Sequence, residues 1–209
     1  MVPNIETNLL NKERNWLVLL IGGASGTGKS SFAYELARFY GVNVLEVDDV
    51  GQALKAMTTK ETLSVLHYFS TGVNWLDIGV DGNKNWLIDV SAEMIPGFKA
   101  IVDRHIEDNL PIIMEGDFIH PDLCASFDRT HVKSLFVVES DRQQVLNNFL
   151  ARENGNLQNF RADISAAHGR WIAASCKKLG IPLIESRPWD TALQRTVDCL
   201  RDYPQRSET

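Results

Sequence analysis

Residues 16–31 read WLVLLIGGASGTGKSS, and this stretch decides how the rest of the chain is interpreted. Residues 16–21 form an apolar run that is typical of a buried strand, and residues 31–40 favour a helix. Between them, residues 23–30 match the pattern G-x-x-x-x-G-K-[ST] of a phosphate-binding loop. The motif requires a strand before it and a helix after it. The sequence therefore predicts a phosphate site rather than a glycine-rich turn that merely caps a helix.

The positions of this loop have separate physical roles. Glycine permits positive φ angles and lets a phosphate approach the backbone closely. The loop amides then point into one concavity, and the following helix adds the positive end of its dipole. Lys29 is expected to bridge the β- and γ-phosphates of a nucleotide, and the Ser30 hydroxyl to bind Mg²⁺. The predicted nucleotide-binding residues of the loop are Gly23, Ala24, Ser25, Gly26, Thr27, Gly28, Lys29, Ser30 and Ser31.

Apolar, β-branched runs alternate with helical stretches along the chain. Helical crossovers between such strands predict a single α/β domain over residues 1–209, with helices on both faces of a parallel sheet. Strands are predicted at 16–21, 42–47, 111–115, 132–138 and 182–185. Helices are predicted at 31–40, 50–57, 60–69, 91–108, 141–153, 163–179 and 190–201, with Ser91 as an N-cap and a polar loop at 72–85.

Composition excludes several classes of protein. The net charge of −6 over 209 residues is unlike the basic surface of a nucleic-acid-binding protein. The three cysteines are widely spaced and contain no Cys-x-x-Cys pair, so neither a disulfide framework nor a zinc site is predicted. No apolar run approaches the length of a membrane span, and the polar first 15 residues lack a signal-peptide core. We expect a cytoplasmic enzyme, monomeric or homodimeric, that binds neither nucleic acid nor membrane.

Acidic residues follow the second and third predicted strands, where ligands of parallel sheets bind. Asp48 and Asp49 follow the second strand, and Glu115 and Asp117 follow the third. One member of the Asp48–Asp49 pair is expected to accept the proton of an attacking hydroxyl, and the other to help hold Mg²⁺. Capping of the next helix is the alternative for this pair, and turn chemistry for Asp117. The predicted metal-binding residues are Ser30, Asp48 and Glu115.

Two further segments carry candidate nucleotide contacts. Arginines within residues 142–162 are expected to form a lid that swings onto the transferring phosphoryl group; Arg152 and Arg161 are the predicted catalytic arginines, and Arg142 a further candidate. A solvated helix face is the alternative for all of them. After the fifth strand, Arg187 and Trp189 are expected to pack on a purine base, although the same segment also fits a helix start.

The segment 50–110 is the predicted acceptor-binding lobe. It has a local excess of aromatic rings, and acidic residues outnumber basic ones between 61 and 108. Aromatic faces suit a ring-bearing or sugar acceptor, whereas a polyanionic acceptor would need a more basic lobe. Core packing is the alternative for Tyr68 and Phe69 in particular. The aromatic residues and the neighbouring histidine are His67, Tyr68, Phe69, Trp75 and Trp86.

The Gly-Gly-Ala-Ser-Gly-Thr-Gly-Lys-Ser loop, the Val-Asp-Asp after the second strand and the Glu-Gly-Asp after the third resemble the small P-loop kinases. That group includes nucleoside, gluconate and shikimate kinases, and the Gly-Gly-Ala-Ser-Gly opening is similar to that of 2-phosphoglycerate kinase-like proteins. The resemblance covers most of residues 16–200. It implies a three-layer P-loop NTPase fold with strand order 2-3-1-4-5, ATP and Mg²⁺ as cofactors, and phosphoryl transfer to a small hydroxyl compound.

By position, the resemblance assigns Lys29 and Ser30 to phosphate and metal, and Glu115 to the metal-side acid. It assigns the base to Asp48 or Asp49, and a lid role to Arg152. The chain is short for a 2-phosphoglycerate kinase and its acceptor lobe is not basic, so that substrate is not carried over.

Other functions of the same fold stay open at this stage. One is a phosphotransferase that modifies an antibiotic or a nucleotide sugar, and another is a regulatory module that binds ATP without catalysis. A GTPase is disfavoured because neither Asn-Lys pair, at 11–12 or 83–84, continues as Asn-Lys-x-Asp.

Overall fold

The central element of the fold is a parallel sheet whose five strands lie in the order β2-β3-β1-β4-β5. The structure, a computed structural model, describes residues 14–153, 155 and 157–203. The strand order predicted from the family resemblance is confirmed. The strands are β1 (Val18–Gly22), β2 (Asn43–Glu46), β3 (Ile112–Glu115), β4 (Val132–Val138) and β5 (Leu183–Glu185).

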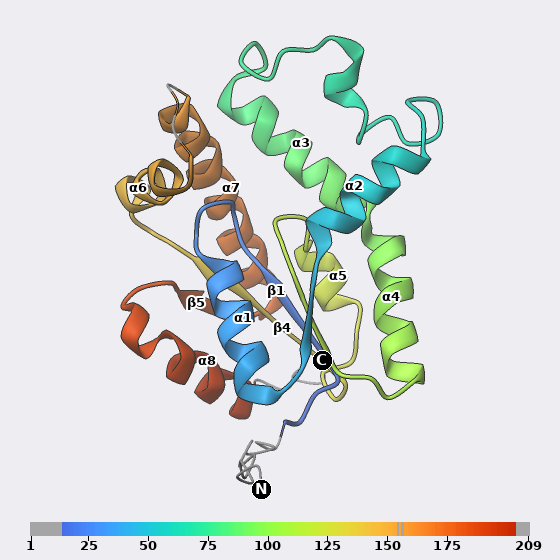
Figure 1. Cartoon of the computed structure of the whole chain (residues 1–209), viewed down its shortest axis with the longest axis vertical. Coiled ribbons are helices and arrows are strands. Elements are labelled where there is room, and N and C mark those ends of the chain that lie inside the picture. The colour runs from blue at the N-terminus through green and yellow to red at the C-terminus, as the bar shows by residue number, and fades with distance from the viewer. Residues whose placement is uncertain (1–13, 154, 156, 204–209) are drawn as a thin grey trace, which may run out of the picture.

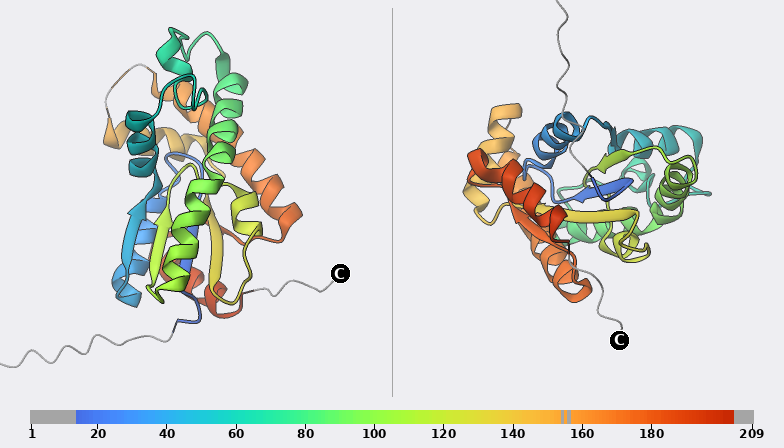
Figure 2. Two further views of the ribbon diagram at one scale, coloured as in Figure 1. Left: turned by 90° about the vertical axis from the view of Figure 1, so that its right-hand side faces the viewer. Right: turned by 90° about the horizontal axis from the view of Figure 1, so that it is seen from below.

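Helices cover both faces of the sheet because successive strand side chains point to opposite sides. In β1, Leu19 and Ile21 face the helices α1 and α8, whereas Val18 and Leu20 face the opposite layer. Figures 1 and 2 show α1 and α8 on one side and α4, α5 and α7 on the other. The bounds of these helices are α1 (Lys29–Tyr40), α4 (Ile95–Glu107), α5 (Pro121–Ala125), α7 (Gln158–Leu179) and α8 (Ala192–Arg201).

Two groups of helices rise above the carboxyl edge of the sheet (Figure 1). The segment between β2 and β3 forms one group, and α6 with the first part of α7 forms the other. This arrangement encloses the space above the loop that follows β1. The additional elements are α2 (Val47–Met57), the 3-10 turn η1 (Tyr68–Thr71), α3 (Gly79–Glu93), α6 (Arg142–Arg152) and the 3-10 turn η2 (Trp189–Thr191).

The segment between β2 and β3 differs from the sequence-based prediction. The predicted loop at 72–85 is wrong in its second half, because α3 begins at Gly79. The predicted helix at 91–108 is also wrong, because α3 ends at Glu93 and α4 begins at Ile95. Ser91 is buried inside α3 and donates to the carbonyl of Ile88, so it is not an N-cap. Tertiary packing of Val90 in the core outweighs the weak helix propensity of this Gly- and Asn-rich stretch.

The predicted helix at 60–69 is wrong as well, because this stretch consists of turns that end in η1. Several other boundaries are shifted. The helix α2 begins at Val47, three residues before the predicted start, so β2 ends at Glu46. The helix α7 begins at Gln158 rather than at 163. The short helix α5, which was not predicted, begins after His120, whose Nδ1 accepts a hydrogen bond from the Asp122 amide at 3.0 Å.

Within the described part of the chain, no helix is both long and apolar enough to span a bilayer.

Candidate active site

The loop after β1 has the backbone geometry of a phosphate cradle. Gly26 and Gly28 have φ angles of 79° and 89°, in the left-handed region that glycine adopts without strain. Gly28 is the N-cap of α1, and the first turn of α1 contains no acidic side chain. The positive end of this helix dipole is therefore available to an anion. Lys29 and Ser30 lie in the first turn, two residues before the predicted start of the helix.

Side chains from α6 and α7 hold the loop in this shape. Asn148 donates from Nδ2 to the carbonyl of Gly26 at 2.8 Å, and Ser165 donates from Oγ to the carbonyl of Ser25 at 2.5 Å. Inside the loop, the Thr27 hydroxyl donates to the carbonyl of Ala24 at 2.9 Å. The carbonyls of Ala24, Ser25 and Gly26 are thus all bonded to groups of the protein.

A cavity of about 450 Å³ opens above the loop. Lys29, which is only 7% exposed, extends into it and forms an ion pair with Asp117. Burial alone would lower the pKa of Lys29, but the carboxylates around it, Asp117 first, raise the pKa above its ordinary value. The lysine is therefore charged. The residues lining this nucleotide cavity are Ser25, Gly26, Gly28, Lys29, Ser30, Ser31, Glu46, Asp48, Glu115, Asp117, Asn148, Ala151, Arg152 and Trp189.

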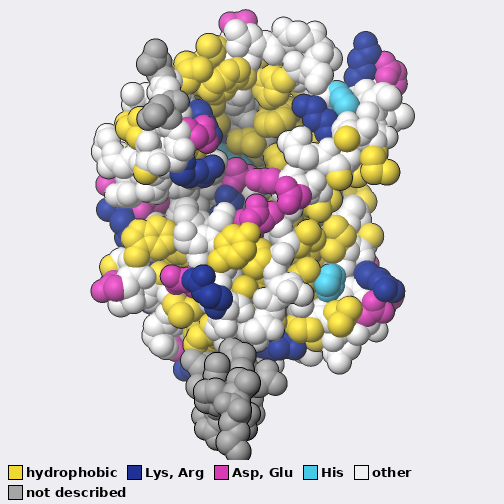
Figure 3. Space-filling model, viewed as in Figure 1, with side chains coloured by type: hydrophobic (Ala, Val, Ile, Leu, Met, Phe, Trp, Pro, Cys, Tyr) yellow, Lys and Arg dark blue, Asp and Glu magenta, His cyan; other side chains and the backbone are white. Residues whose placement is uncertain are grey.

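The acidic residues of the nucleotide cavity come from the ends of β2 and β3. Glu46 and Glu115 are partners in the register of these strands, so they lie side by side at the carboxyl edge. Figure 3 shows acidic side chains gathered in the middle of the hollowed face, with basic side chains beside them. Burial raises the pKa of Glu115, and burial and nearby Asp117 raise the pKa of Asp48 to about 6 although the Asp48 side chain keeps contact with solvent.

The structure separates the two members of the predicted Asp48–Asp49 pair. The sequence-based prediction placed both directly after the second strand, but both lie in the first turn of α2. Neither residue is the N-cap of this helix. Successive helical residues point about 100° apart, so Asp48 lines the nucleotide cavity and Asp49 does not. Sequence reasoning missed Glu46, which takes part in the cavity wall instead. The Glu-x-Asp spacing at a strand end was the signal for it.

The donor set at the loop fits a magnesium ion that is shared with a nucleotide. Glu115 is 3% exposed, and its Oε2 atom is buried without a hydrogen-bond partner. Ser30 lies close enough to the same carboxylate to oppose the rise of its pKa, which burial causes. In the described residues, no group of three or more His, Cys, Asp or Glu side chains forms a ready ion site. Mg²⁺ in phosphate-transfer sites is usually held by one or two carboxylates together with substrate phosphates. Glu115 would provide the carboxylate and Ser30 a hydroxyl oxygen, so these residues fit such an ion.

A second cavity, of about 270 Å³, adjoins the nucleotide cavity. Ser25 and Asp117 line both. Its walls come from the segment before α3, from α3 itself, and from α6 and α7. The lining residues of this acceptor cavity are Ser25, Trp75, Asn83, Trp86, Leu87, Asp117, Phe149, Arg161, Ile164, Ser165 and His168. Asn83, Leu87 and His168 were not predicted, because no local pattern marks a residue that faces a cavity from a helix.

Two of the predicted aromatic residues reach this acceptor cavity and the others do not. Trp75 packs on Phe160 with ring centroids 5.1 Å apart, and Trp86 is fixed by a 2.9 Å hydrogen bond from Nε1 to the carbonyl of Val65. Phe69 packs behind Trp86, at 4.8 Å between ring centroids. Tyr68 is exposed. The lobe thus presents the two tryptophans to the cavity and uses Phe69 as support.

His168 is a buried titratable group in the wall of the acceptor cavity. It is 2% exposed, it stacks on Trp171 with ring centroids 5.8 Å apart, and its Nδ1 atom has no hydrogen-bond partner. Burial lowers the pKa of His168 to about 4, against an ordinary value of 6.5. The imidazole is therefore neutral at pH 7.

The depressed pKa of His168 predicts an acid-sensitive fold. The unfolded chain binds a proton at this histidine near pH 6.5 and the folded protein only near pH 4, so stability is lost as the pH falls through that window. The His168 contribution amounts to about 3 kcal/mol. His168→Gln should flatten the pH dependence of the free energy of unfolding, measured by urea denaturation. The exposed His131→Gln is the control and should follow the wild-type curve; equal slopes in all three proteins would contradict the prediction.

The predicted arginines are divided between the cavities and the surface. Arg152 lines the nucleotide cavity, and Arg161 lines the acceptor cavity, where its guanidinium lies 4.5 Å from the Phe149 ring centroid. Arg142 joins α6 to α7 by a 2.5 Å ion pair from Nε to Asp163 Oδ1. Arg142 lines a separate cavity of about 370 Å³ together with Ala24 and Thr27, and it does not line the nucleotide cavity.

The two residues predicted to contact a base also differ in their positions. Trp189 lines the nucleotide cavity and packs against Gly28, where an added Cβ would approach its ring to 2.1 Å. Arg187 donates from Nε and Nη2 to the Glu139 carboxylate at 2.7 and 2.8 Å, and it does not line the nucleotide cavity. This double hydrogen bond links the β5–α8 connection to the end of β4.

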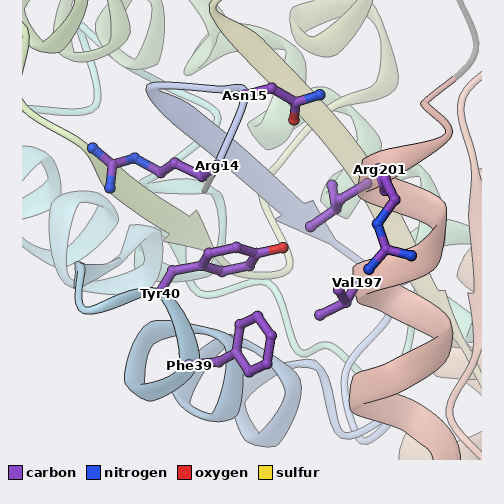
Figure 4. Close-up of a pocket in the computed structure, with 7 residues that line it drawn as sticks. Arg14, Asn15, Phe39, Tyr40, Val197 and Arg201 are labelled. Carbon is purple, nitrogen blue, oxygen red and sulfur yellow. The ribbon is translucent and has the colours of Figure 1, made fainter. Parts of the chain in front are cut away.

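A larger cavity, of about 730 Å³, lies far from the phosphate loop. It is formed between the end of α1 and α8, where Phe39 and Tyr40 face Val197 and Arg201 (Figure 4). Arg14 and Asn15 complete its wall. Among the described residues, its lining contains no carboxylate and no residue of the phosphate loop, whereas both adjoining cavities at the other end of the sheet contain them.

Comparisons with known proteins agree with this geometry. The 2-phosphoglycerate kinase of Methanocaldococcus jannaschii is 25% identical over 94% of this chain, and that of Pyrococcus horikoshii is 24% identical over 88%. The chain spans 66% and 67% of the lengths of these relatives. No family model matches the chain.

Solved structures show the same fold. A shikimate kinase from Acinetobacter baumannii in complex with shikimate has a TM-score of 0.54 and 13% identity, covering 92% of this chain and 97% of its own. A gluconokinase from Sinorhizobium meliloti has a TM-score of 0.51 and 15% identity, covering 90% of this chain and 94% of its own. This chain is therefore similar in sequence to 2-phosphoglycerate kinases and shares its fold with a shikimate kinase and a gluconokinase.

Proposed function

We propose that this protein is a kinase that transfers the γ-phosphoryl group of ATP to a hydroxyl group of a small molecule. The observation that carries the proposal is that the nucleotide cavity and the acceptor cavity meet at Ser25 and Asp117. Phosphoryl transfer needs a donor and an acceptor held in line, with a group nearby that takes the acceptor's proton. The names of the sequence relatives and the phosphate loop support the same reaction.

The donor half of the reaction is assigned to the residues of the loop and of α6. ATP would supply the phosphoryl group, and Mg²⁺ would neutralise its charge. Lys29 would balance charge on the phosphates, and Ser30 with Glu115 would hold the cation. Arg152 would stabilise charge that develops during transfer, because it lines the nucleotide cavity from the last turn of α6. Trp189 would pack against the nucleotide.

The proton-accepting carboxylate is proposed to be Asp117, with Asp48 as the competing candidate. Asp117 lines both cavities, whereas Asp48 lines the nucleotide cavity alone. The two are close in space, since burial and then the charge of Asp117 raise the pKa of Asp48. In the proposed step, the acceptor oxygen bonds to phosphorus, the bond from phosphorus to the β-phosphate oxygen breaks, and the hydroxyl proton passes to Asp117.

The proposal is tested by two measurements on the purified chain. Isothermal titration with a non-hydrolysable ATP analogue and Mg²⁺ should give saturable binding. ADP release should then rise above its acceptor-free rate when pools of small hydroxyl compounds are added. Failure to bind the analogue would overturn the donor site. Binding without acceptor-dependent ADP release from any pool would instead indicate an ATP-binding module without catalysis.

The division of Arg152 and Arg161 between the cavities predicts different kinetic effects. Arg152→Ala should lower kcat by about ten- to a hundredfold with little change in affinity for the ATP analogue, because it acts on charge that develops in the transition state. Arg161→Ala should mainly raise the KM of the acceptor. The exposed Arg38→Ala is the control for loss of a surface charge. Full activity in both cavity variants would mean that these arginines belong to a solvated surface.

A further inference from the structure

The acceptor cavity has an unusual charge balance for a kinase related to enzymes of phosphorylated acids. Among the described residues that line it, Arg161 has the one fixed positive charge. That charge is already balanced, because Arg161 Nη1 contacts Glu153 Oε2 at 2.5 Å and Gln158 Oε1 at 3.2 Å. His168, the other basic side chain of the wall, is neutral because burial lowers its pKa to about 4.

The acidic side of the same cavity is balanced as well. Asp117 forms an ion pair with Lys29, which belongs to the phosphate loop. A compound with two or three negative charges would therefore enter a cavity that offers it no unpaired cation, and it would lose its hydration without compensation. Nothing in the described wall replaces the arginine or lysine cluster that such a ligand requires.

The remaining wall is apolar and flat, with a few uncharged polar atoms. Trp75 and Trp86 provide ring faces, and Leu87, Phe149 and Ile164 provide aliphatic and aromatic contacts. Asn83 donates from Nδ2 to the carbonyls of Trp75 and Gly79 at 2.6 and 2.7 Å, so its amide oxygen is the atom that can meet a ligand. The buried Nδ1 atom of His168 is the second uncharged group without a partner.

The size of the cavity limits the ligand further. A volume of about 270 Å³ is slightly below the usual range for ligand pockets, so it suits one ring rather than a nucleotide or an oligosaccharide. Hydroxyl groups of a ligand would meet polar side chains of this lining, which include Asp117, Asn83 and His168, while the CH face of a saturated ring would lie on a tryptophan.

From these observations, and resting on the proposed kinase function, we infer that the acceptor is an uncharged, monocyclic polyol of monosaccharide or cyclitol size. The hydroxyl to be phosphorylated faces Asp117, which takes its proton as the new oxygen–phosphorus bond forms and ADP leaves. The enzyme thus differs in acceptor charge from the 2-phosphoglycerate kinases that it resembles in sequence.

The inference is tested with pools of hydroxyl compounds that differ in charge, in size or in the presence of a ring. ADP release is measured with Mg-ATP and each of five pools: neutral hexoses, pentoses and cyclitols; their carboxylate derivatives; their phosphate monoesters, together with 2-phosphoglycerate; nucleosides; and acyclic polyols. The neutral pool should stimulate ADP release at least tenfold more than either anionic pool. Equal or greater stimulation by an anionic pool, by nucleosides or by acyclic polyols would overturn the inference. The inference would also be overturned if the neutral pool did not stimulate ADP release.

The failure of this inference can be told from failure of the proposed function. If the ATP analogue binds and an anionic pool stimulates ADP release, the kinase function stands and the acceptor class is wrong. If the analogue does not bind, the proposed function itself fails.

A variant pair adds a second readout for the most active neutral compound. Trp75→Leu should raise its KM about tenfold through loss of one aromatic contact. Tyr68→Leu removes an exposed aromatic ring from the same lobe without touching the cavity and should leave KM unchanged. Equal effects in the two variants would contradict the cavity assignment.

Discussion

Replacement of Lys29 by alanine is expected to weaken binding of an ATP analogue by about 1.5–3 kcal/mol, the contribution of a charge-assisted hydrogen bond. Turnover should fall by a further factor of about 10² to 10³, because the lysine's charge has its greatest effect on a phosphoryl group in transfer. Lys29 is well placed for this role, since it is 7% exposed and starts in the first turn of α1 beneath the cavity. Isothermal titration and steady-state kinetics measure the two effects separately.

The matched control is Lys177→Ala, which removes an exposed lysine from the last turn of α7. It should change neither measurement. Because Lys29→Ala also leaves Asp117 without its ion-pair partner, thermal unfolding should be recorded for each variant. Unchanged affinity for the analogue in a folded Lys29→Ala protein would contradict the assignment of the loop as a phosphate site.

Asp117→Asn is expected to lower phosphoryl transfer by about a hundredfold or more, within the range for loss of a general base. The affinity for the ATP analogue should be maintained or increased. Asp117 is paired with Lys29, so its neutralisation removes a carboxylate that competes with the phosphates for the lysine. A fall in turnover with intact or tighter nucleotide binding is therefore the specific signature of an acceptor-side base.

Variants at Asp48 and Asp49 complete the test. Asp48→Asn should raise the Mg²⁺ concentration needed for half-maximal activity, since Asp48 lines the nucleotide cavity beside Glu115. Asp49→Asn, at the neighbouring position of α2, should behave as wild type, because Asp49 faces away from both cavities. A hundredfold loss at Asp48 with near-normal transfer in Asp117→Asn would reassign the base to Asp48.

The family resemblance and the local patterns together predicted the strand order and the position of the phosphate loop. β4 was predicted at its observed bounds, Val132–Val138, because a long apolar run between polar turns has few other interpretations. The segment from Gly72 to Asp108 was predicted poorly. Its helices are stabilised by packing on α7 and on the sheet, and such contacts leave little trace in local composition.

The candidate site likewise contains some residues that the sequence predicted and others that only the fold brings together. The sequence by itself predicted Lys29, Ser30 and Glu115 as neighbours, because a contiguous motif contains the first two and the parallel pairing of β3 with β1 places a strand end beside it. Only the tertiary structure showed which carboxylate lines both cavities. Asp117 joins the two cavities, whereas Asp49 is turned away by the helical rotation of α2. The aromatic wall of the acceptor cavity also depends on the fold, because Trp75 and His168 meet there only after α3 packs against α7.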